Sequence, residues 1–560
     1  MKIYLSKLLK KARFFLEKFR PDSILIIFII LASIKFVFSI ESIEDIRLAD
    51  ESDYLYKGVN LTKHGLAPAE WGPLYSVWYY LLSVFVRNNV ELYYLNYKIL
   101  IILTTAALYI YLRRIKITYF ISIVVSILYL ISGAHLIQTW VSHFALLILF
   151  TFLIWGTFVK NQLTKYCLIG FGILMVSYIR PEFFISFLIF FILFFCVISK
   201  IIIFEKNPKI INFGRVGLFL TFILLTIFFL GNPLSGNRSW IAFGQHFSVN
   251  YVKWNNMAIN PFTNWEGIVN SVYGNKHNII SAVMINPWQF LKHVFSNAGN
   301  CIPEFLNNLL ADFEFLPRFL NKVLRLSEIS VFIFTGLYLF KKRGEIRKIF
   351  KDNGSKEIVV LFMIINIVTF VVILVIYPRS HYMILGGAML LVLVSYLVSE
   401  INKNITGKPS SLMKTFLIGL FILVLIPSLA IGWKIIPVHL EAKEGDRHID
   451  VIKFVQSLNI ATPINMLEAD GGYFIYLTDN YKRIPEWEKK EPFCEFILCR
   501  NINMVVFSED LANDIRFNND DEFKAFLINP QMLGFIKVEI PNCRVKCLFI
   551  KNNLYRKRSV

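Results

Sequence analysis

A cluster of acidic residues follows the first long apolar segment of the chain, in the stretch R-L-A-D-E-S-D-Y-L-Y-K-G from Arg47 to Gly58. In a helix, Asp50, Asp53 and Tyr54 stand at positions i, i+3 and i+4 and share one face, whereas Glu51 is turned away by about 100°. A carboxylate held at a membrane edge can act as a general base on a polar substrate. The alternative is that these are solvated loop residues.

Two arginines stand where apolar segments end. Arg180 is beside Glu182 in S-Y-I-R-P-E-F-F, and Arg379 precedes His381 in I-Y-P-R-S-H-Y. A guanidinium suits phosphate because it donates two parallel hydrogen bonds. The alternative is an ordinary arginine that extends its head group from a helix end to water.

The composition places these residues in a membrane protein. Of 560 residues, 56% are hydrophobic and 18% are charged, whereas soluble domains carry about 25% charged residues. Apolar runs of about 18 residues recur, which predicts a polytopic α-helical membrane protein. The net charge of +20 is explained by basic cytoplasmic loops. No nucleic-acid motif accompanies it, so no nucleic-acid partner is expected.

Charge bias sets the predicted topology. The apolar stretch 73–86 would form a helix about 21 Å long, too short to cross a bilayer of about 30 Å. If it lies on the outer face, the basic loops all fall in the cytoplasm, as the positive-inside rule requires. Eleven spans are then predicted, at 23–40, 95–112, 117–134, 143–159, 165–179, 182–199, 214–231, 327–340, 357–377, 380–398 and 412–433.

Three parts follow from this topology. Residues 1–22 form a basic cytoplasmic N-terminus without a cleavage site, and residues 23–433 form the transmembrane domain with outer loops 41–94 and 231–327. Residues 434–560 are predicted to be an extracytoplasmic α/β domain, because D-R-H-I-D-V-I-K-F-V-Q-S-L has helical periodicity and P-I-N-M-L, N-M-V-V-F and G-F-I-K-V-E-I read as short strands.

The first outer loop resembles that of a known superfamily. D-E-S-D-Y (50–54), followed by G-P-L-Y-S-V-W, looks like the loop of GT-C membrane glycosyltransferases, in the branch of the lipid A aminoarabinose transferases and protein O-mannosyltransferases. The layout is also similar, with many spans, a juxtamembrane helix in the first loop and an outer C-terminal domain.

This resemblance implies an inverting transferase of the bacterial inner membrane that takes a sugar from a polyprenyl-phosphate donor within the membrane lipid. The acceptor is open among glycolipid, polysaccharide and protein. Asp50 matches the family's base, with Glu51 as its partner. The residues expected to bind substrates are Asp53, Tyr54, Arg180, Glu182, Arg379 and His381.

The chain departs from the family pattern in the next outer loop. That loop, S-G-A-H-L-I-Q-T-W-V-S-H-F, lacks the usual second aspartate, and His135 or His143 is either a polar substitute or a loop residue. Since carboxylates are the ligands that Mg²⁺ and Mn²⁺ prefer, neither a metal nor another cofactor is expected.

Other readings stay open. Asn237, Arg238, Trp240 and His246 suit either an acceptor groove or an interfacial helix. One or two disulfides are expected among Cys494, Cys499, Cys543 and Cys547 if the tail is in an oxidising compartment. The rival function is a transporter or flippase of lipid-linked anions, and a third is a scaffold. A cleft open on one side favours transfer, and a path open to both faces favours transport.

Overall fold

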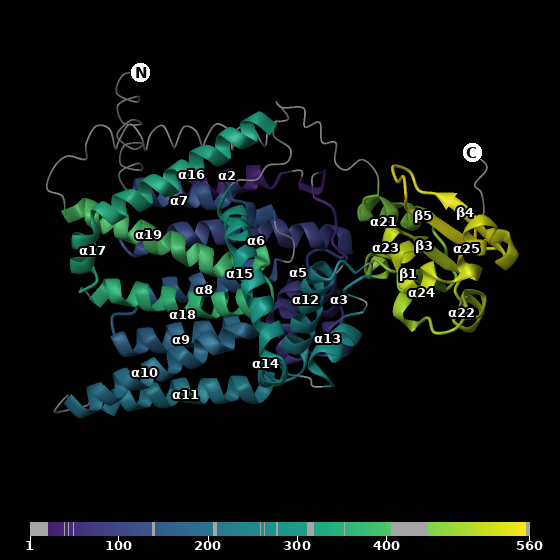
Figure 1. Cartoon of the computed structure of the whole chain (residues 1–560). Helices are drawn as coiled ribbons and strands as arrows, with labels where there is room; N and C mark the ends of the chain where they lie inside the picture. Colours follow the sequence, from purple (N-terminus) through teal and green to yellow (C-terminus); the bar gives the residue numbers. More distant parts are fainter. Residues whose placement is uncertain are drawn as a thin grey trace, which may run out of the picture.

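The computed structural model divides into a mostly helical part and a small C-terminal sheet domain (Figure 1). It describes residues 21–38, 40–42, 44–48, 50–136, 140–204, 210–257, 259–262, 264–275, 278–310, 318–351, 353–404 and 446–555.

Long helices make up most of the helical part and are packed side by side (Figure 1). They are apolar over most of their length. One side of each helix is buried against its neighbours, and the exposed side is also apolar, which suits an apolar surrounding. The long helices are α2 (Pro21–Phe36), α6 (Asn89–Arg114), α7 (Tyr119–Ile131), α8 (Val141–Phe158), α9 (Gln162–Ser177), α10 (Phe184–Phe204), α11 (Ile210–Leu230), α16 (Arg318–Lys341), α18 (Asn353–Val375) and α19 (Ile384–Asn404), with the short α17 (Arg343–Ile349) before α18.

Five helical segments of the described chain are long and apolar enough to cross a membrane, namely Asn89–Arg114, Val141–Phe158, Pro181–Ser199, Ser355–Val375 and Ile384–Asn402. Three others, Tyr119–Ile131, Gln162–Ser177 and Gly214–Leu230, are apolar but shorter. The sequence predicted eleven spans. Ten of those ranges coincide with a helix, and the eleventh, 412–433, lies outside the described residues.

The remaining helices of the helical part, most of them short, gather at the end that faces the sheet domain, here called the domain-facing end (Figure 1). The predicted surface helix is α5, and its 11 residues are too few to cross a bilayer. The elements at this end are η1 (Ile40–Ser42), α3 (Asp50–Val59), α4 (Leu61–His64), η2 (Ala69–Trp71), α5 (Pro73–Ser83), η3 (Gly133–Leu136), η4 (Pro181–Phe183), α12 (Arg238–Trp254), α13 (Trp265–Tyr273), α14 (Ile279–Ile285), α15 (Pro287–Leu309) and η5 (Ser380–Tyr382).

The sheet domain is a five-stranded mixed sheet with strand order β2-β1-β3-β5-β4. Strands β2, β1 and β3 are parallel, and β5 is antiparallel to both β3 and β4. The strands are β1 (Ile464–Glu468), β2 (Tyr481–Pro485), β3 (Met504–Phe507), β4 (Phe535–Glu539) and β5 (Cys547–Lys551). The sequence located β1, β3 and β4 but missed β2, which reads Y-K-R-I-P, and β5.

Helices and turns connect these strands, and five buried phenylalanines pack together beneath one face of the sheet. The phenylalanines are Phe493, Phe496, Phe517, Phe523 and Phe526. The connecting elements are α21 (His448–Ser457), η6 (Tyr473–Tyr476), η7 (Glu486–Glu488), α22 (Phe493–Cys499), α23 (Glu509–Asn513), α24 (Ile515–Asn518), α25 (Asp521–Ile528) and η8 (Pro530–Leu533). The predicted helix over this domain's first residues is confirmed as α21.

The expected disulfides are absent, and all seven cysteines of the chain are free. Cys494 and Cys499 are five residues apart on α22, so their side chains point about 140° away from each other around the helix. Cys547 is buried at the start of β5. Whether these cysteines can pair therefore depends on where the helix and the strand place their side chains, and not on their spacing along the sequence.

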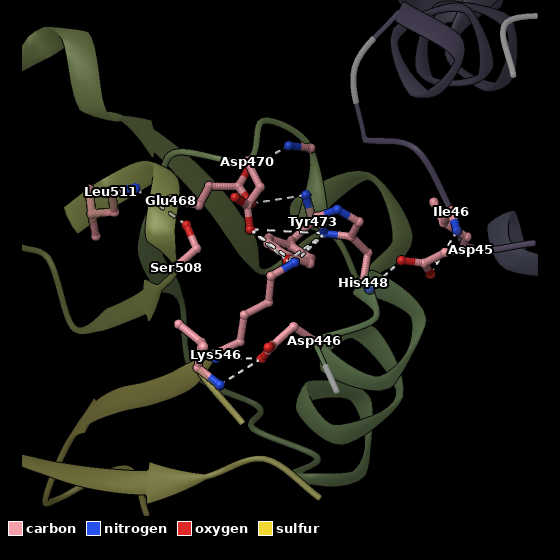
Figure 2. Close-up of polar contacts among 12 residues, drawn as sticks. Asp45, Ile46, Asp446, His448, Glu468, Asp470, Tyr473, Ser508, Leu511 and Lys546 are labelled. Atoms are coloured by element: carbon pink, nitrogen blue, oxygen red, sulfur yellow. Dashed lines mark hydrogen bonds and ion pairs between the residues drawn. The ribbon is translucent and has the colours of Figure 1, made fainter. Parts of the chain in front are cut away.

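A carboxylate in the first loop of the helical part caps a helix of the sheet domain. This contact holds the two parts together. Asp45 accepts hydrogen bonds from the backbone N–H of His448 at 2.7 Å and of Ile449 at 3.1 Å, at the start of α21 (Figure 2). The N-cap residue Arg447 supplies no side-chain cap of its own. Its guanidinium instead donates to the carbonyl of Glu41 at 2.9 Å.

Polar groups surround this contact on the sheet-domain side (Figure 2). The ammonium of Lys546 donates to Nδ1 of His448 at 2.9 Å and to the hydroxyl of Tyr473 at 3.2 Å, and Tyr473 donates to Asp470 at 2.8 Å. Burial, followed by the charge of Lys546, lowers the pKa of His448. A neutral His448 can therefore accept the hydrogen bond from the ammonium.

Removal of the capping carboxylate is expected to loosen the docking of the sheet domain. Loss of a helix cap costs about 1 kcal/mol, so in Asp45→Ala the amides at the start of α21 should exchange with deuterium roughly 5-fold faster than in wild type. Hydrogen exchange with mass spectrometry measures this. Asp479→Ala, which removes an exposed carboxylate from a turn of the same domain, is the matched control, and equal exchange in both variants would contradict the capping role.

Candidate functional site

A cavity of about 240 Å³ lies at the domain-facing end, among α3, α10, α12 and α18. Part of its lining consists of polar and charged residues: Asp50, Tyr54, Glu70, Arg180, Glu182, Ser235, Arg238, Ser239, His381 and Tyr382. Apolar residues line the rest, mainly Val141, Ile185, Leu234, Ala242, Ile279, Val371, Val372, Val375 and Ile376.

The helix α3, which carries the acidic cluster, packs tightly on α5. Gly58 makes this approach possible, because a Cβ at that position would stand 2.4 Å from the Cβ of Tyr79. At the other end of α5, Gly72 adopts a left-handed conformation with φ of 64°, and a Cβ there would stand 2.5 Å from the carbonyl oxygen of Ile179. Two glycines thus bring α3 and the residue preceding Arg180 against the same helix.

Glu51 faces away from the cavity and is fully buried. One carboxylate oxygen accepts hydrogen bonds from the hydroxyls of Tyr75, at 2.5 Å, and Tyr79, and from the amide of Asn96 at 3.2 Å. The other accepts from the backbone N–H of Trp140 at 2.8 Å. Glu51, which the sequence named as the partner of Asp50, therefore joins α3 to α5, α6 and the start of α8 and is not part of the cavity lining.

Asp50 and Tyr54 do line the cavity, one helical turn apart. Asp50 is exposed, and its carboxylate forms no hydrogen bond or ion pair with any other described residue. Tyr54 is buried and accepts a hydrogen bond from Arg238 at 3.0 Å. Although burial acts in the opposite direction, Tyr54 and Asp50 together raise the pKa of Arg238 above its usual value, so this guanidinium stays charged.

Arg238 is held in place on three sides. Besides Tyr54, it donates to the backbone carbonyl of Glu70 at 2.8 Å, and its guanidinium carbon lies 4.4 Å from the ring centroid of Trp71. A guanidinium has five N–H donors, so these contacts leave donors for a bound anion. The sequence named Arg238 for an acceptor groove, and the structure places it in the same cavity as Asp50.

A second guanidinium, which is buried, also lines the cavity. Arg180 donates through Nε to Glu182 at 2.7 Å, and its guanidinium carbon lies 4.7 Å from the ring centroid of Tyr382. Next to it, His381 lines the cavity, and burial, followed by the charges of Arg180 and Arg379, lowers its pKa well below the usual value. His381 is therefore a neutral hydrogen-bonding group near pH 7.

Besides Glu51, two further predicted site residues are outside the cavity lining. Asp53 pairs with Lys57 at 2.6 Å and is not among the lining residues. Arg379 precedes His381 but is not part of the lining. Burial, followed by the charge of Arg379, also lowers the pKa of His246, whose ring is stacked on that of Tyr377 at a centroid distance of 4.9 Å.

The sequence analysis did not identify Glu70 and Tyr382 as site residues. Glu70 stands in the turn A-E-W-G just before α5, and Tyr382 directly follows His381. Both are polar residues at helix ends, and the predicted topology puts them on the same side of the membrane as Asp50. This signal could have identified them. Trp240 is buried in a separate cluster with Phe243.

The two histidines of the second loop are also outside the cavity. His135 and His143 are fully buried with ring centroids 5.3 Å apart. Within the described chain, no group of three or more His, Cys, Asp or Glu side chains is arranged to hold a metal ion.

The apolar wall of the cavity reaches the outside of the helical part. Ile185 on α10 and Val371 on α18 line the cavity, and both are also exposed, next to other exposed apolar residues such as Leu188 and Phe370. If these helices cross a membrane, this wall lies beside the lipid. The cavity lining then combines charged groups with apolar residues that also contact the lipid.

No protein-family model matches this chain, and no curated protein resembles it at a significant level. A function must therefore be inferred from the residues that the cavity brings together.

Glu51 gives a pH-dependent prediction. Burial raises its pKa to about 7, although hydrogen bonds from Tyr75, Tyr79 and Trp140 act against the shift. In the unfolded chain the group ionises near 4.5, so the free energy of unfolding should fall as pH rises from about 4.5 to 7, by on the order of 3 kcal/mol. Because Glu51→Gln cannot titrate, its Tm should fall less than that of wild type across this window.

Thermal unfolding of the detergent-solubilised proteins at several pH values measures the difference. Glu468, whose pKa burial also raises to about 7, is present in both proteins, so its contribution cancels. Equal slopes of Tm against pH in both proteins would show that Glu51 does not titrate in this window.

Proposed function

We propose that this protein is a GT-C-type glycosyltransferase that moves a sugar from a polyprenyl-phosphate donor to an acceptor hydroxyl on the outer face of the membrane. One observation carries the proposal. A carboxylate that is exposed and forms no hydrogen bond or ion pair with another described residue, one half-buried and one buried guanidinium group, and apolar residues that are also exposed on the helix exterior all line one cavity.

The donor chemistry matches both sides of this cavity. A polyprenyl-phosphate sugar has a long apolar tail, an anionic phosphate and a polar sugar. The tail fits the wall that contains Ile185 and Val371, because it can remain in lipid while the head group enters. The phosphate fits beside Arg238 and Arg180, since guanidinium groups bind phosphate oxygens through paired hydrogen bonds.

Asp50 is the proposed general base. The acceptor oxygen attacks the anomeric carbon from the side opposite the phosphate, the bond from that carbon to the phosphate oxygen breaks, and the configuration is inverted. The hydroxyl proton passes to the Asp50 carboxylate. The products are the glycosylated acceptor and polyprenyl phosphate. The leaving phosphate needs no proton, and the two arginines stabilise its charge.

The transporter alternative has less support. A transport path would connect both ends of the long helices. The lining residues of this cavity come from the first turns of α3, α10 and α12 and the last turns of α18, which meet at the domain-facing end. The arrangement favours a reaction at one membrane face.

Neutralising the base is expected to stop transfer. Asp50→Asn keeps the shape but cannot accept the proton, so turnover should fall by roughly 10²- to 10⁴-fold while binding of the lipid donor is retained. Surface glycoconjugates from strains with the intact gene, a deletion or the variant are compared by mass spectrometry at matched membrane abundance. The deletion should lose the mass of one sugar, and so should the variant.

Asp53→Asn is the matched control, because Asp53 is on the same helix but outside the cavity. It should keep transfer near the wild-type level. If Asp50→Asn transfers sugar normally while the deletion does not, Asp50 is not the base and the transporter reading becomes the better one.

The phosphate role of Arg238 is tested by a change that keeps its charge. Lysine cannot donate the paired hydrogen bonds, so Arg238→Lys should raise KM for the lipid donor about 10-fold, or about 1.4 kcal/mol. Arg379→Lys, outside the lining, should change KM less than roughly 3-fold. A larger increase in KM for Arg379→Lys than for Arg238→Lys would mean that the phosphate binds near Arg379, on the other side of His381, and not near Arg238.

A further inference from the structure

Helix α15 has the reverse of the side-chain distribution found in water-soluble proteins. A helix on a soluble protein buries its apolar side and exposes its polar side. In α15 the fully buried side chains include His293 and Asn297, whereas Trp288 and Phe295 are more than 70% exposed, at 74% and 72%. Exposed apolar side chains of this size need a surrounding other than water.

The buried polar side chains of α15 bind the end of α18. The last carbonyl groups of a helix have no partner within the helix. Here Asn297 donates to the carbonyl of Leu374 at 2.9 Å, and the Nε2 atom of His293 lies 3.1 Å from the carbonyl oxygens of both Val375 and Ile376. Asn250 of α12 completes the network, 2.9 Å from both His293 and Asn297.

These contacts fix α15 across the ends of the long helices (Figure 1). Near its C-terminal end, Asn308 donates to the carbonyl of Ser380 at 2.6 Å, and the carbonyl of Leu310 accepts from Gly133 at 2.9 Å. Both ends of α15 are therefore bound at the same end of the helical part. A helix held this way runs along a membrane surface rather than through it.

The exposed apolar side chains form one stripe. With about 100° between successive residues, the exposed residues Trp288, Leu291, Phe295, Ile302 and Leu306 lie within about 60° of one another around α15. The stripe continues onto α14, where Ile280 and Met284 are 78% and 79% exposed.

A polar edge runs along one side of this stripe. Lys292 and Asn307 are exposed, and both lie about 40–100° from Trp288 around the helix. The ammonium of Lys292 is 4.5 Å from the ring centroid of Trp254. The helix thus has a side toward the protein, a side of large apolar groups and an edge of polar groups, which is the pattern of a helix lying between hydrocarbon and water.

We propose that α14 and α15 lie in the membrane interface, with the stripe of Ile280, Met284, Trp288, Leu291 and Phe295 inserted among the lipid acyl chains. The stripe begins next to Ile279, which lines the cavity, and α15 packs against α18, whose exposed Val371 also lines the cavity. The bilayer therefore reaches the apolar wall of the cavity. This inference concerns the bilayer, and it holds whether or not the cavity transfers a sugar.

Photo-crosslinking in liposomes tests the proposal without an activity assay. p-Benzoylphenylalanine is placed at Phe295 in one variant and at Trp288 in another, and the proteins are reconstituted in phosphatidylethanolamine and phosphatidylglycerol. Ile528 on the sheet domain, which is 86% exposed, is the control for an exposed apolar position. Mass spectrometry should find adducts of one phospholipid at 288 and 295 at least 10-fold more often than at 528.

Three outcomes would overturn the proposal. Equal lipid adducts at 295 and 528 would mean that the stripe is not in the bilayer. Crosslinked dimers would assign it to a second copy of the chain, and an intrachain crosslink to residues 412–433 would assign it to that segment.

Fluorescence gives a second measurement that needs no introduced group. Brominated phospholipids should quench Trp288, so Trp288→Phe should reduce the quenchable fraction of the emission. An unchanged quenchable fraction in the variant would count against insertion.

Discussion

Hydrogen bonds to one buried carboxylate hold the candidate site together. Glu51 accepts from Tyr75, Tyr79, Asn96 and the backbone of Trp140, and so ties α3 to three other helices. A buried carboxylate without such donors would be strongly destabilising, so the position of α3 is restricted to the one that satisfies all four. Because adjacent residues of a helix point about 100° apart, burying Glu51 directs Asp50 into the cavity.

The acidic residues between the first long helix and α5 therefore have different roles, which depend on their surroundings. Asp45 caps α21 of the sheet domain, Glu51 joins helices, Asp53 pairs with Lys57, and Asp50 alone is exposed in the cavity without a described partner. The sheet domain contacts the same segment again where the hydroxyls of Ser52 and Tyr476 lie 2.6 Å apart. Contacts with both the helical part and the sheet domain thus hold the start of α3 in place. They restrict the position of Asp50, although this residue lies in an exposed turn.

In the proposed arrangement, the membrane and the cavity meet at the start of α10 and the end of α18. The carbonyl groups at the end of α18 are satisfied by His293 and Asn297, which turns the apolar side of α15 outward. The same last turns of α18 supply Val371, Val372 and Val375 to the cavity wall. A lipid-linked substrate would then reach the charged side of the cavity without its tail leaving an apolar surrounding, which is the physical reason for placing such a site at a helix end.

The sequence by itself determined the class of protein and the location of much of its secondary structure. Apolar runs predict helices because the pattern is local, and ten of the eleven predicted ranges coincide with helices. The helical spacing of Asp50 and Tyr54 likewise placed both on one side of α3. The short strand β2 was missed, because Y-K-R-I-P is stabilised by its pairing with β1 and not by its own composition.

Only the tertiary structure decided which polar residue does what. Glu51 and Asp50 are neighbours in sequence with the same charge, and the difference between a buried helix linker and an exposed carboxylate arises from donors 24 to 89 positions away. Arg238 and Glu70 join the site for the same reason, across 168 positions. Contacts between distant segments are set by how helices pack, and no local pattern encodes them.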